Sequence, residues 1–238
     1  MDLIKISRMA EHNFVGNKCG VMDQFAVVMG QYKKLILLNC ESMEYRLIDA
    51  DFSPYNIVLL NSNVSHNLVS SEYNVRVAEC EKALGTIQKK HPEYTFLADV
   101  PETVVESLKD KMSKKVYQRA LYVSQENTRT LKAAELIQNG EIHKFGELMY
   151  KTHQGLSKYY EVSCPELNFL VDLTQNIPQV IGSRMMGGGF GGCTISLVKE
   201  DFVNTFIDLV KKMYKKQFNI ALSPILVEIS NGVEITNQ

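Results

Sequence analysis

Five glycines surround Phe190 in a six-residue stretch that could hold a ligand against the backbone. They are Gly187, Gly188, Gly189, Gly191 and Gly192, and their spacing contains the pattern G-x-G-x-x-G. A dinucleotide-binding fingerprint needs a helix after these glycines, whereas the pattern of residues 194–198 predicts a strand. No Lys-Ser or Lys-Thr pair follows, which argues against a P-loop. The pattern favours a backbone that approaches another group closely. A plain turn is the open alternative, and an NAD-binding protein would rest on the glycine spacing alone.

A second candidate is Asp23, which lies in the hexapeptide Cys19–Gln24 ahead of an apolar run. A carboxylate beside a bound hydroxyl group can accept its proton, which is the chemistry of a general base. An Asp just after a loop also serves as a helix N-cap or as a solvated surface charge. The hexapeptide alone favours that second interpretation.

The overall composition points to a small-molecule ligand. The 238 residues are 45% hydrophobic, and 26 Lys and Arg nearly balance 27 Asp and Glu. Without a net field, neither nucleic acid nor a membrane surface is expected as a partner. Charges interrupt the first fifteen residues and no run approaches the ~18 apolar residues of a membrane span. Five widely spaced cysteines without a C-x-x-C pair predict reduced thiols, and we therefore expect a cytoplasmic protein.

The periodicity of the apolar residues, together with the cap and turn residues between them, predicts the α+β class. Helices are grouped between separated strand regions, which does not suit a doubly wound sheet. Residues 41–54 form a polar stretch that could separate two lobes, and Ser163 with Glu166 predicts a capping box ahead of a helix that starts near Pro165. Further helices are expected over residues 3–14, 70–90, 115–139, 142–156 and 201–215, and strands over residues 25–29, 35–38, 57–60, 194–198 and 225–229. The first two strands read as a hairpin whose turn is residues 30–34.

Several segments resemble the motifs of galactokinases, in the same order along the chain. The similar stretches are A-E-H-N-F-V-G at 10–16, C-G-V-M-D-Q-F at 19–25, N-S-N-V at 61–64, S-S-E-Y-N-V-R at 70–76, Y-E-V-S-C-P-E-L at 160–167 and R-M-M-G-G-G-F-G-G-C at 184–193. The matches span nearly the whole chain, so the sequence is identified as a member of this family by resemblance.

The resemblance implies a fold and a reaction. Galactokinases are GHMP kinases with two lobes, which transfer the γ-phosphoryl group of ATP to the C1 hydroxyl of galactose with the help of Mg²⁺. Residues 1–50 would be the end of the N-terminal lobe, a helix and hairpin that carry the catalytic Asp. Residues 51–238 would be the whole C-terminal domain.

The resemblance also implies roles for single residues. Asp23 would be the catalytic carboxylate at the sugar, Glu11 the Mg²⁺ ligand, and Gly20 and Tyr73 further contacts to galactose, with the glycine loop beside sugar and phosphates. A loose phosphoryl-transfer transition state needs a positioned hydroxyl, a proton acceptor and a metal that neutralises charge. On one unbroken helix Glu11 and Asp23 would lie about 18 Å apart, but the break at residues 16–20 lets the chain return. Without the family match, Glu11 would read as a solvated helix position and Tyr73 as a half-buried aromatic.

The sequence departs from the family pattern in two ways. The galactokinase motifs R-x-N-L-I-G-E-H-x-D-Y, which grips the sugar, and P-x-G-x-G-L-S-S-S, which cradles ATP phosphates, do not occur in it. The chain also begins inside a helical pattern without a cap, and we therefore expect a fragment that is inactive by itself. Met186 stands where the family usually has Thr, which removes a hydroxyl from the loop.

Two alternatives to a galactokinase stay open. One is a kinase for a related sugar such as N-acetylgalactosamine or arabinose, because most of the sugar-reading motif is absent. The other is a non-catalytic, galactokinase-like sugar sensor. A sensor does not need catalytic carboxylates, so the presence of Asp23 and Glu11 favours the enzyme.

Overall fold

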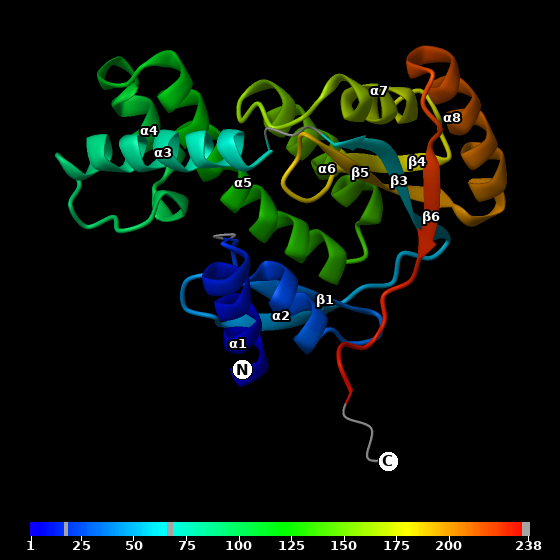
Figure 1. Ribbon diagram of the computed structural model, residues 1–238, viewed down its shortest axis with the longest axis horizontal. Helices are drawn as coiled ribbons and strands as arrows, with labels where there is room; N and C mark the ends of the chain where they lie inside the picture. The colour runs from blue at the N-terminus through cyan, green and yellow to red at the C-terminus, as the bar shows by residue number, and fades with distance from the viewer. Residues whose placement is uncertain (17–18, 66–68, 235–238) are drawn as a thin grey trace. The chain divides into compact units, whose positions relative to one another are not determined.

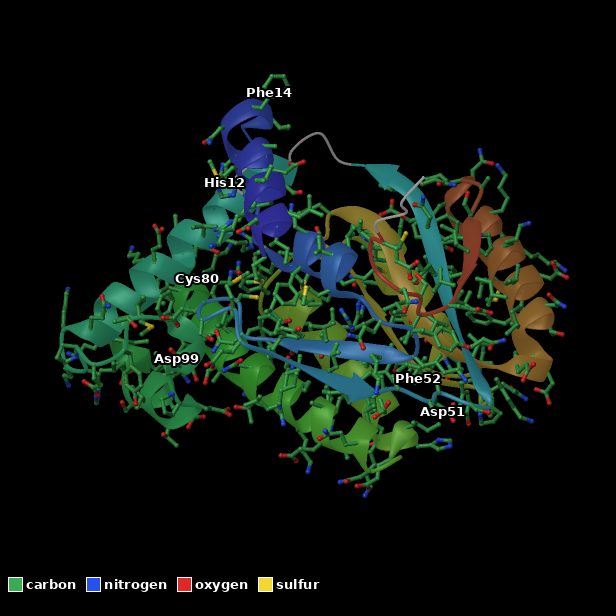
Figure 2. All side chains as sticks on the ribbon, turned by 90° about the horizontal axis from the view of Figure 1, so that it is seen from below. His12, Phe14, Asp51, Phe52, Cys80 and Asp99 are labelled. Carbon is green, nitrogen blue, oxygen red and sulfur yellow. The ribbon has the colours of Figure 1, made fainter. Side chains whose placement is uncertain are left out.

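The computed structural model describes residues 1–16, 19–65 and 69–234, without the side chains of residues 65, 69–71 and 73 (Figure 1). The chain divides into two compact units. Unit one comprises Met1–Asp51, Ile137–Gly140 and Glu228–Gln238, and unit two comprises Phe52–Leu136 and Glu141–Val227. The change of unit after Asp51 falls inside the polar stretch at residues 41–54 (Figure 2). The assignment of residues 1–50 and 51–238 to two kinase lobes stays a prediction.

Unit one contains short helices and a β-hairpin. α1 (Asp2–Ala10) continues into the π-helical turn η1 (Glu11–Val15), α2 (Met22–Met29) follows, and β1 (Lys34–Leu38) pairs antiparallel with β2 (Tyr45–Asp49). A small core holds these elements together by removing apolar surface from water. Its buried members are Ile4, Val21 and Phe25, against which Val28, Met29, Ile36, Leu38 and Met43 pack.

The predicted strand over residues 25–29 is wrong, because these residues form most of α2. Val21, Phe25 and Met29 recur every fourth residue and share the core side, whereas Val27 is 60% exposed. That distribution is the one-sided burial of a helix, which a short apolar run alone does not distinguish from a strand.

The predicted hairpin exists in part. Residues 35–38 are a strand, as expected, but its partner follows it, so that the turn is residues 39–44 and not residues 30–34. The side-chain oxygen of Asn39 accepts hydrogen bonds from the amides of Glu41 (2.9 Å) and Ser42 (3.2 Å). An Asn that binds amides two and three residues ahead closes a turn locally, which explains where the chain reverses.

The predicted first helix is present as α1 and η1, but its apolar residues do not form a buried face. Within unit one, Ile4 is buried, whereas Leu3 and Ile6 are 47% and 63% exposed. Phe14, at the end of η1, is 93% exposed (Figure 2). The periodicity therefore located the helix without locating its core-facing side.

A late segment of the chain completes unit one. The amide of Gly232 donates to the carbonyl of Gly30 (2.7 Å), and the amide of Val233 donates to the carbonyl of Val27 (2.9 Å). Asn231 Oδ1 accepts a further hydrogen bond from the amide of Tyr32 (2.8 Å). The two backbones approach so closely that a Cβ on Gly232 would lie 2.6 Å from the carbonyl oxygen of Val27.

Unit two is built on a four-stranded antiparallel sheet with the order β4-β5-β3-β6. The strands are β3 (Tyr55–Ser65), β4 (Val180–Met185), β5 (Gly191–Lys199) and β6 (Ser223–Val227). β3 lies centrally and pairs with β5 and β6, with Leu60 opposite Thr194 and Pro224. The predicted strands at residues 57–60 and 194–198 are confirmed, and the one at 225–229 is β6, which begins two residues earlier than predicted.

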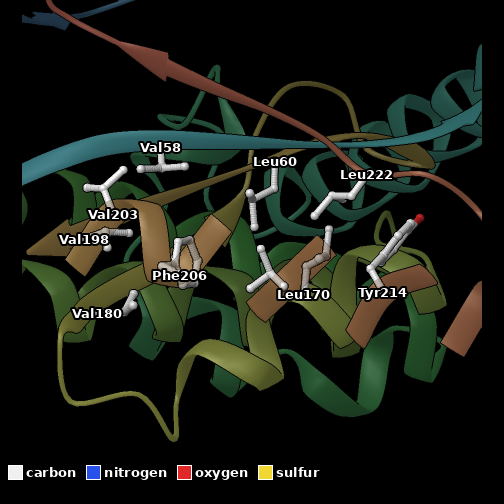
Figure 3. Packing of buried hydrophobic residues seen from close by; sticks show 10 residues of the cluster. Val58, Leu60, Leu170, Val180, Val198, Val203, Phe206, Tyr214 and Leu222 are labelled. Atoms are coloured by element: carbon white, nitrogen blue, oxygen red, sulfur yellow. The ribbon is translucent and has the colours of Figure 1, made fainter. Parts of the chain in front are cut away.

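Helices pack beside this sheet and close the main core. α6 (Ile142–Lys158), α7 (Pro165–Thr174) and α8 (Val203–Phe218) contact its strands or its core residues, and Figure 1 shows α7 and α8 beside the sheet. The buried cluster combines alternate residues of β3 with one face of α8 (Figure 3). Its members are Val58, Leu60, Leu170, Val180, Val198, Val203, Phe206, Val210, Tyr214 and Leu222.

A second group of helices in unit two packs around its own buried cluster. The group comprises α3 (Val69–Gln88), α4 (Glu102–Ser107) and α5 (Lys114–Gln138), with short 3-10 turns at Leu97–Asp99 and Lys109–Lys111. A further 3-10 turn, Glu200–Phe202, precedes α8. Gly140 follows α5 with a φ of +70°, the left-handed conformation that ends a helix, as its position in the sequence predicted. Helices and antiparallel strands occur in separate groups, which confirms the α+β class.

The capping box predicted ahead of α7 is wrong. Cys164, in an extended conformation, is the N-cap residue, and no side chain caps this helix. Ser163 therefore lies one residue too early to reach the first free amides, and its Oγ and Glu166 Oε2 have no hydrogen-bond partner among the described residues. Pro165 in the first turn correctly marked where α7 begins.

Candidate functional site

The glycine loop lies between two strands of the sheet in unit two. β4 ends at Met185 and β5 begins at Gly191, and the amide of Met186 donates to the carbonyl of Cys193 (3.0 Å) at the base of the loop. A dinucleotide fingerprint would need a helix after the glycines, where this chain has a strand. The interpretation as an NAD site is therefore excluded by the fold.

One glycine in the loop is required by a close backbone contact. Gly189 has a φ of +86°, and a Cβ at this position would overlap the carbonyl oxygen of Val162. The next residue, Phe190, also has a positive φ (+58°), and its amide donates to the same carbonyl (2.7 Å). The glycine run thus serves a close backbone approach, as the sequence suggested.

An open hollow of about 570 Å³ is lined by Met186, the glycine loop and three residues of β3. The lining residues of β3 are Asn61, Asn63 and Val64, from the segment that resembles N-S-N-V. Ser62 in the same segment donates from Oγ to the carbonyl of Gly192 (2.8 Å). The β3 segment and the loop therefore form one hydrogen-bonded wall. Asn61 Oδ1 accepts from the amide of Asn63, and Asn63 Nδ2 donates to Ala221 and Ser223, so the wall offers mainly backbone groups to a polar ligand.

A buried histidine supports the strand that enters the loop. The amide of Met185 donates to His153 Nδ1 (3.2 Å), and His153 is 95% buried on α6. Burial lowers the pKa of His153 to about 4, so the ring is neutral at physiological pH and Nδ1 can accept this hydrogen bond. α6 comes close enough because Gly146 and Gly182 have no side chains where the helix crosses β4.

Asp23 lies in the first turn of α2 in unit one, and its side chain is exposed. The amide of Phe25, two residues later, donates to the carbonyl of Val21 (2.9 Å), which starts the helix. A carboxylate in this place is favoured by the positive end of the helix dipole. It is also free to meet a ligand from solvent, as a general base requires.

Glu11 is half-buried at the start of η1 in the same unit. Gly16 ends this turn with a φ of +78°, and His12 Nε2 donates to the carbonyl of Cys19 (2.8 Å). Among the described residues, the helix that starts at Asp2 therefore ends before Gly16 and the next begins at Met22, so no unbroken helix separates Glu11 from Asp23. The predicted break is thus present, whereas the approach of Glu11 to Asp23 stays a prediction.

Of the two predicted sugar contacts, the structure describes Gly20 but not the side chain of Tyr73. Gly20 precedes α2, and a Cβ built on it meets no described atom within 4 Å, so the space beside it is open to a ligand. Tyr73 lies on α3, and its side chain is outside the described part of the structure. Glu11, Gly20 and Asp23 belong to unit one, whereas Tyr73 and the glycine loop belong to unit two.

Mg²⁺ was predicted at Glu11. Among the described residues, no cluster of three or more His, Cys, Asp or Glu side chains could hold a metal ion by itself. Mg²⁺ is commonly bound by one or two carboxylates together with water and substrate phosphates, so a single half-buried carboxylate fits that pattern.

In the described part of the chain, no helix is both long and apolar enough to cross a membrane.

Sequence reasoning missed the buried polar residues next to β4 and to the segment after α6. Arg119 is fully buried on α5, between Glu79 and Glu161, and His153 is buried on α6. The hydrogen bond between Glu161 and Arg119 holds the pKa of Glu161 below its usual value. One signal was present: Arg119 lies between the core positions Val116 and Ala120, where a solvated arginine is out of pattern.

The chain is similar to known kinases in both sequence and structure. The model of the family described as GHMP kinases C terminal matches residues 133–216. The galactokinase of Clostridium acetobutylicum is 40% identical over 238 residues, which are 100% of this chain and 61% of that protein. The galactokinase of Thermotoga maritima is 38% identical over 98% of this chain and 64% of its own length. The chain thus spans about 60% of the length of these relatives.

Solved structures agree with this similarity. The crystal structure of Lactococcus lactis galactokinase complexed with galactose superimposes with a TM-score of 0.92 at 32% identity, and covers 96% of this chain and 59% of that one. Mevalonate kinase of Methanococcus jannaschii shares the fold, with a TM-score of 0.54 at 17% identity over 97% of this chain and 56% of its own. The chain thus matches the C-terminal domain of the GHMP kinases over residues 133–216 and is similar to galactokinases along its whole length.

Proposed function

We propose that this chain takes part in the transfer of the γ-phosphoryl group of ATP to the C1 hydroxyl of galactose. The observation that supports this most strongly is the 40% identity to a galactokinase along the whole chain. The TM-score of 0.92 to a galactokinase complexed with galactose supports the same substrate. All five cysteines are free thiols, which suits a cytoplasmic enzyme.

In this proposal each part of the chain has a chemical task. Asp23 accepts the proton of the sugar hydroxyl, because its carboxylate is exposed at the start of α2. Gly20 leaves room for the sugar, Tyr73 contacts it, and Glu11 supplies a carboxylate ligand for Mg²⁺. Mg²⁺, when bound with ATP, neutralises phosphate charge. The glycine loop offers its backbone to the sugar and phosphates.

The test compares the 238-residue chain with a hybrid protein. The hybrid joins this chain to the part of Clostridium acetobutylicum galactokinase that the match leaves uncovered. We expect galactose-dependent ADP formation from the hybrid and none from the 238 residues alone, since the sequence has no phosphate-cradling loop. Turnover by the 238 residues alone would contradict the second expectation, and a folded hybrid without turnover would contradict the proposal.

Two controls separate the alternatives. Asp23→Asn in the hybrid should lower kcat by about 10³-fold, since general-base catalysis contributes 10²–10⁴-fold. Unchanged turnover would remove Asp23 from the reaction. N-acetylgalactosamine and arabinose, assayed beside galactose, distinguish a galactokinase from a kinase for another sugar. Sugar binding without turnover, in a folded hybrid, would indicate a sensor.

A further inference from the structure

The segment between α6 and α7 is held by its carbonyl groups. Residues 159–162 follow the last helical residue of α6 and have no strand or helix of their own. The carbonyl of Tyr159 accepts a hydrogen bond from Arg119 Nη1. The carbonyls of Tyr160 and Glu161 accept from Arg76 Nε (2.7 Å) and Arg76 Nη2 (2.8 Å). Three successive peptide groups are thus fixed by two guanidinium groups.

The fourth carbonyl of this series holds the glycine loop. Val162 is 5% exposed, and its carbonyl accepts the hydrogen bond from the amide of Phe190 (2.7 Å). Gly189 lies against the same oxygen, in a position where any side chain would collide with it. The position of this one carbonyl oxygen therefore decides where the middle of the loop can lie.

The two arginines, which are buried, are themselves fixed by ion pairs with more exposed glutamates. Arg119 has no exposed surface and binds Glu79 Oε2 through Nε (2.7 Å) and Glu161 Oε2 through Nη2 (2.6 Å). Arg76, whose side chain is 8% exposed, lies 3.4 Å from the same Glu79 oxygen through Nη1. A buried guanidinium needs such partners for its donors, and its rigid fork fixes their direction. We call Arg76, Arg119, Glu79 and Glu161 the arginine clamp.

We propose that Arg76 and Arg119 are positioning residues of the glycine loop. The clamp sets the path of residues 159–161, that path sets the carbonyl of Val162, and this carbonyl sets Phe190. Arg76 lies on α3, three residues after Tyr73, so one helix carries a proposed sugar contact and a support of the loop. The effect on catalysis rests on the proposed function, but the control of loop position does not.

Lysine at position 76 tests the geometry without removing the charge. Lysine has one ammonium group in place of the planar fork, so it cannot hold two successive carbonyls as Arg76 does. Arg129→Lys is the matched control, because Arg129 forms its ion pair with Glu126 on its own helix, α5. Amide hydrogen exchange of the 238-residue chain, followed by NMR, reports on the Phe190 amide directly.

We expect Arg76→Lys to accelerate exchange of the Phe190 amide by about tenfold, the effect of weakening one hydrogen bond. The amides of the β3–β5 ladder should keep their protection, and Arg129→Lys should leave Phe190 unchanged. A Phe190 amide as protected as in the wild type, in a folded Arg76→Lys protein, overturns the proposal. Should Arg76→Lys also lose the ladder protection, Glu79→Gln repeats the test, since it weakens the hold on both arginines.

A double-mutant comparison separates positioning from general destabilisation. Gly189→Ala breaks the contact with Val162 at the loop side, so adding Arg76→Lys should then change Phe190 exchange less than it does in the wild type. Multiplicative effects of the two changes would show independent actions and overturn the proposal. In the hybrid enzyme, Arg76→Lys should lower kcat/KM for galactose by about tenfold at an unchanged melting temperature.

Hydrogen exchange of Phe190 and turnover of the hybrid test the two proposals separately. If the wild-type hybrid phosphorylates nothing, the proposed function fails, whereas the exchange result still decides the role of the clamp. If exchange of Phe190 rises and turnover of the hybrid stays at the wild-type level, the clamp has no influence on the reaction, and its assignment as a catalytic positioning device is overturned.

Discussion

The candidate residues of the two units are held in different ways. The glycine loop of unit two is tied at several points to buried groups, through Val162, His153 and Ser62. In unit one, a hydrogen bond from His12 to the carbonyl of Cys19 joins η1 to the residues before α2, beside a core with three buried side chains. The first arrangement fixes a backbone, whereas the second presents an exposed carboxylate.

This contrast indicates a division of work between a rigid surface and an adaptable group. Under the proposed function the amides of the loop meet phosphate or sugar oxygens, and such a loop gains from fixed positions, because misplacement by 1 Å can cost 10²-fold in rate. A carboxylate on a short helix tolerates small movements until the substrate is bound. Changes in unit two should therefore have larger effects on stability than comparable changes in unit one.

The largest effect is expected for Gly189→Ala. The new methyl group would overlap the carbonyl oxygen of Val162 at a φ of +86°, so we expect a loss of about 3–4 kcal/mol in the free energy of unfolding. Gly188→Ala is the control, because a Cβ there meets no described atom within 4 Å. Urea unfolding measures both. Equal stabilities would show that the loop moves freely away from Val162.

The next effect is a dependence of stability on pH that comes from His153. Burial lowers its pKa from 6.5 to about 4, so between these values the unfolded chain binds more protons than the folded one. Stability should fall as the pH falls from about 6.5 to about 4, by about 3 kcal/mol in total. His153→Asn keeps an acceptor for the Met185 amide without titrating in this range, and should flatten the curve. A variant with the wild-type slope would show that another group is responsible.

A smaller effect is expected for His12→Ala in unit one. The variant removes the hydrogen bond to the carbonyl of Cys19, which should cost about 1 kcal/mol and speed hydrogen exchange at the start of α2. His91→Ala, which removes a half-buried histidine of unit two paired with Glu93, is the control. If exchange in α2 stays unchanged, the return of the chain is held by other contacts.

The smallest effect concerns Glu161. Its bond with Arg119 lowers its pKa below the ordinary 4.5, so its stabilising contribution is present above about pH 4.5 and is lost as the pH falls through the lower, folded-state value. The side chain is 41% exposed, which keeps this contribution under about 1 kcal/mol. Glu161→Gln should lose it at neutral pH and lose nothing further in acid. Unfolding curves at pH 3 and pH 7 provide the measurement.

Sequence patterns located most elements and misassigned a few, for identifiable reasons. The long helices of unit two and strand β3 follow from periodicity and from terminators such as Gly140 and Pro165. Residues 25–29 were mistaken for a strand because a five-residue apolar run carries no period of its own. The hairpin turn was misplaced because it is closed by the side chain of Asn39. The capping box was wrong because the N-cap of α7 is Cys164, one residue after Ser163.

The site was predictable only as far as its motifs extend. The resemblance pointed to Asp23, Glu11 and the glycine loop, whereas the supports of the loop join residues far apart in sequence. Arg76 and Tyr160 are 84 residues apart, and Arg119 and Glu79 are 40 apart. No local pattern specifies such pairs, because they depend on how α3, α5 and the segment after α6 pack.

The contact between residues 27–32 and 231–233 has a consequence for biosynthesis. The amide of Tyr32 and the side chain of Asn231 are separated by 199 residues, so at 5–20 residues per second the ribosome needs on the order of 10–40 s to supply the missing partner. During that interval α2 has already been synthesised, but its hydrogen bonds with residues 232 and 233 have not formed. The segment that carries Asp23 is thus made early and completed late, which exposes it to chaperones and proteases for the whole of that time.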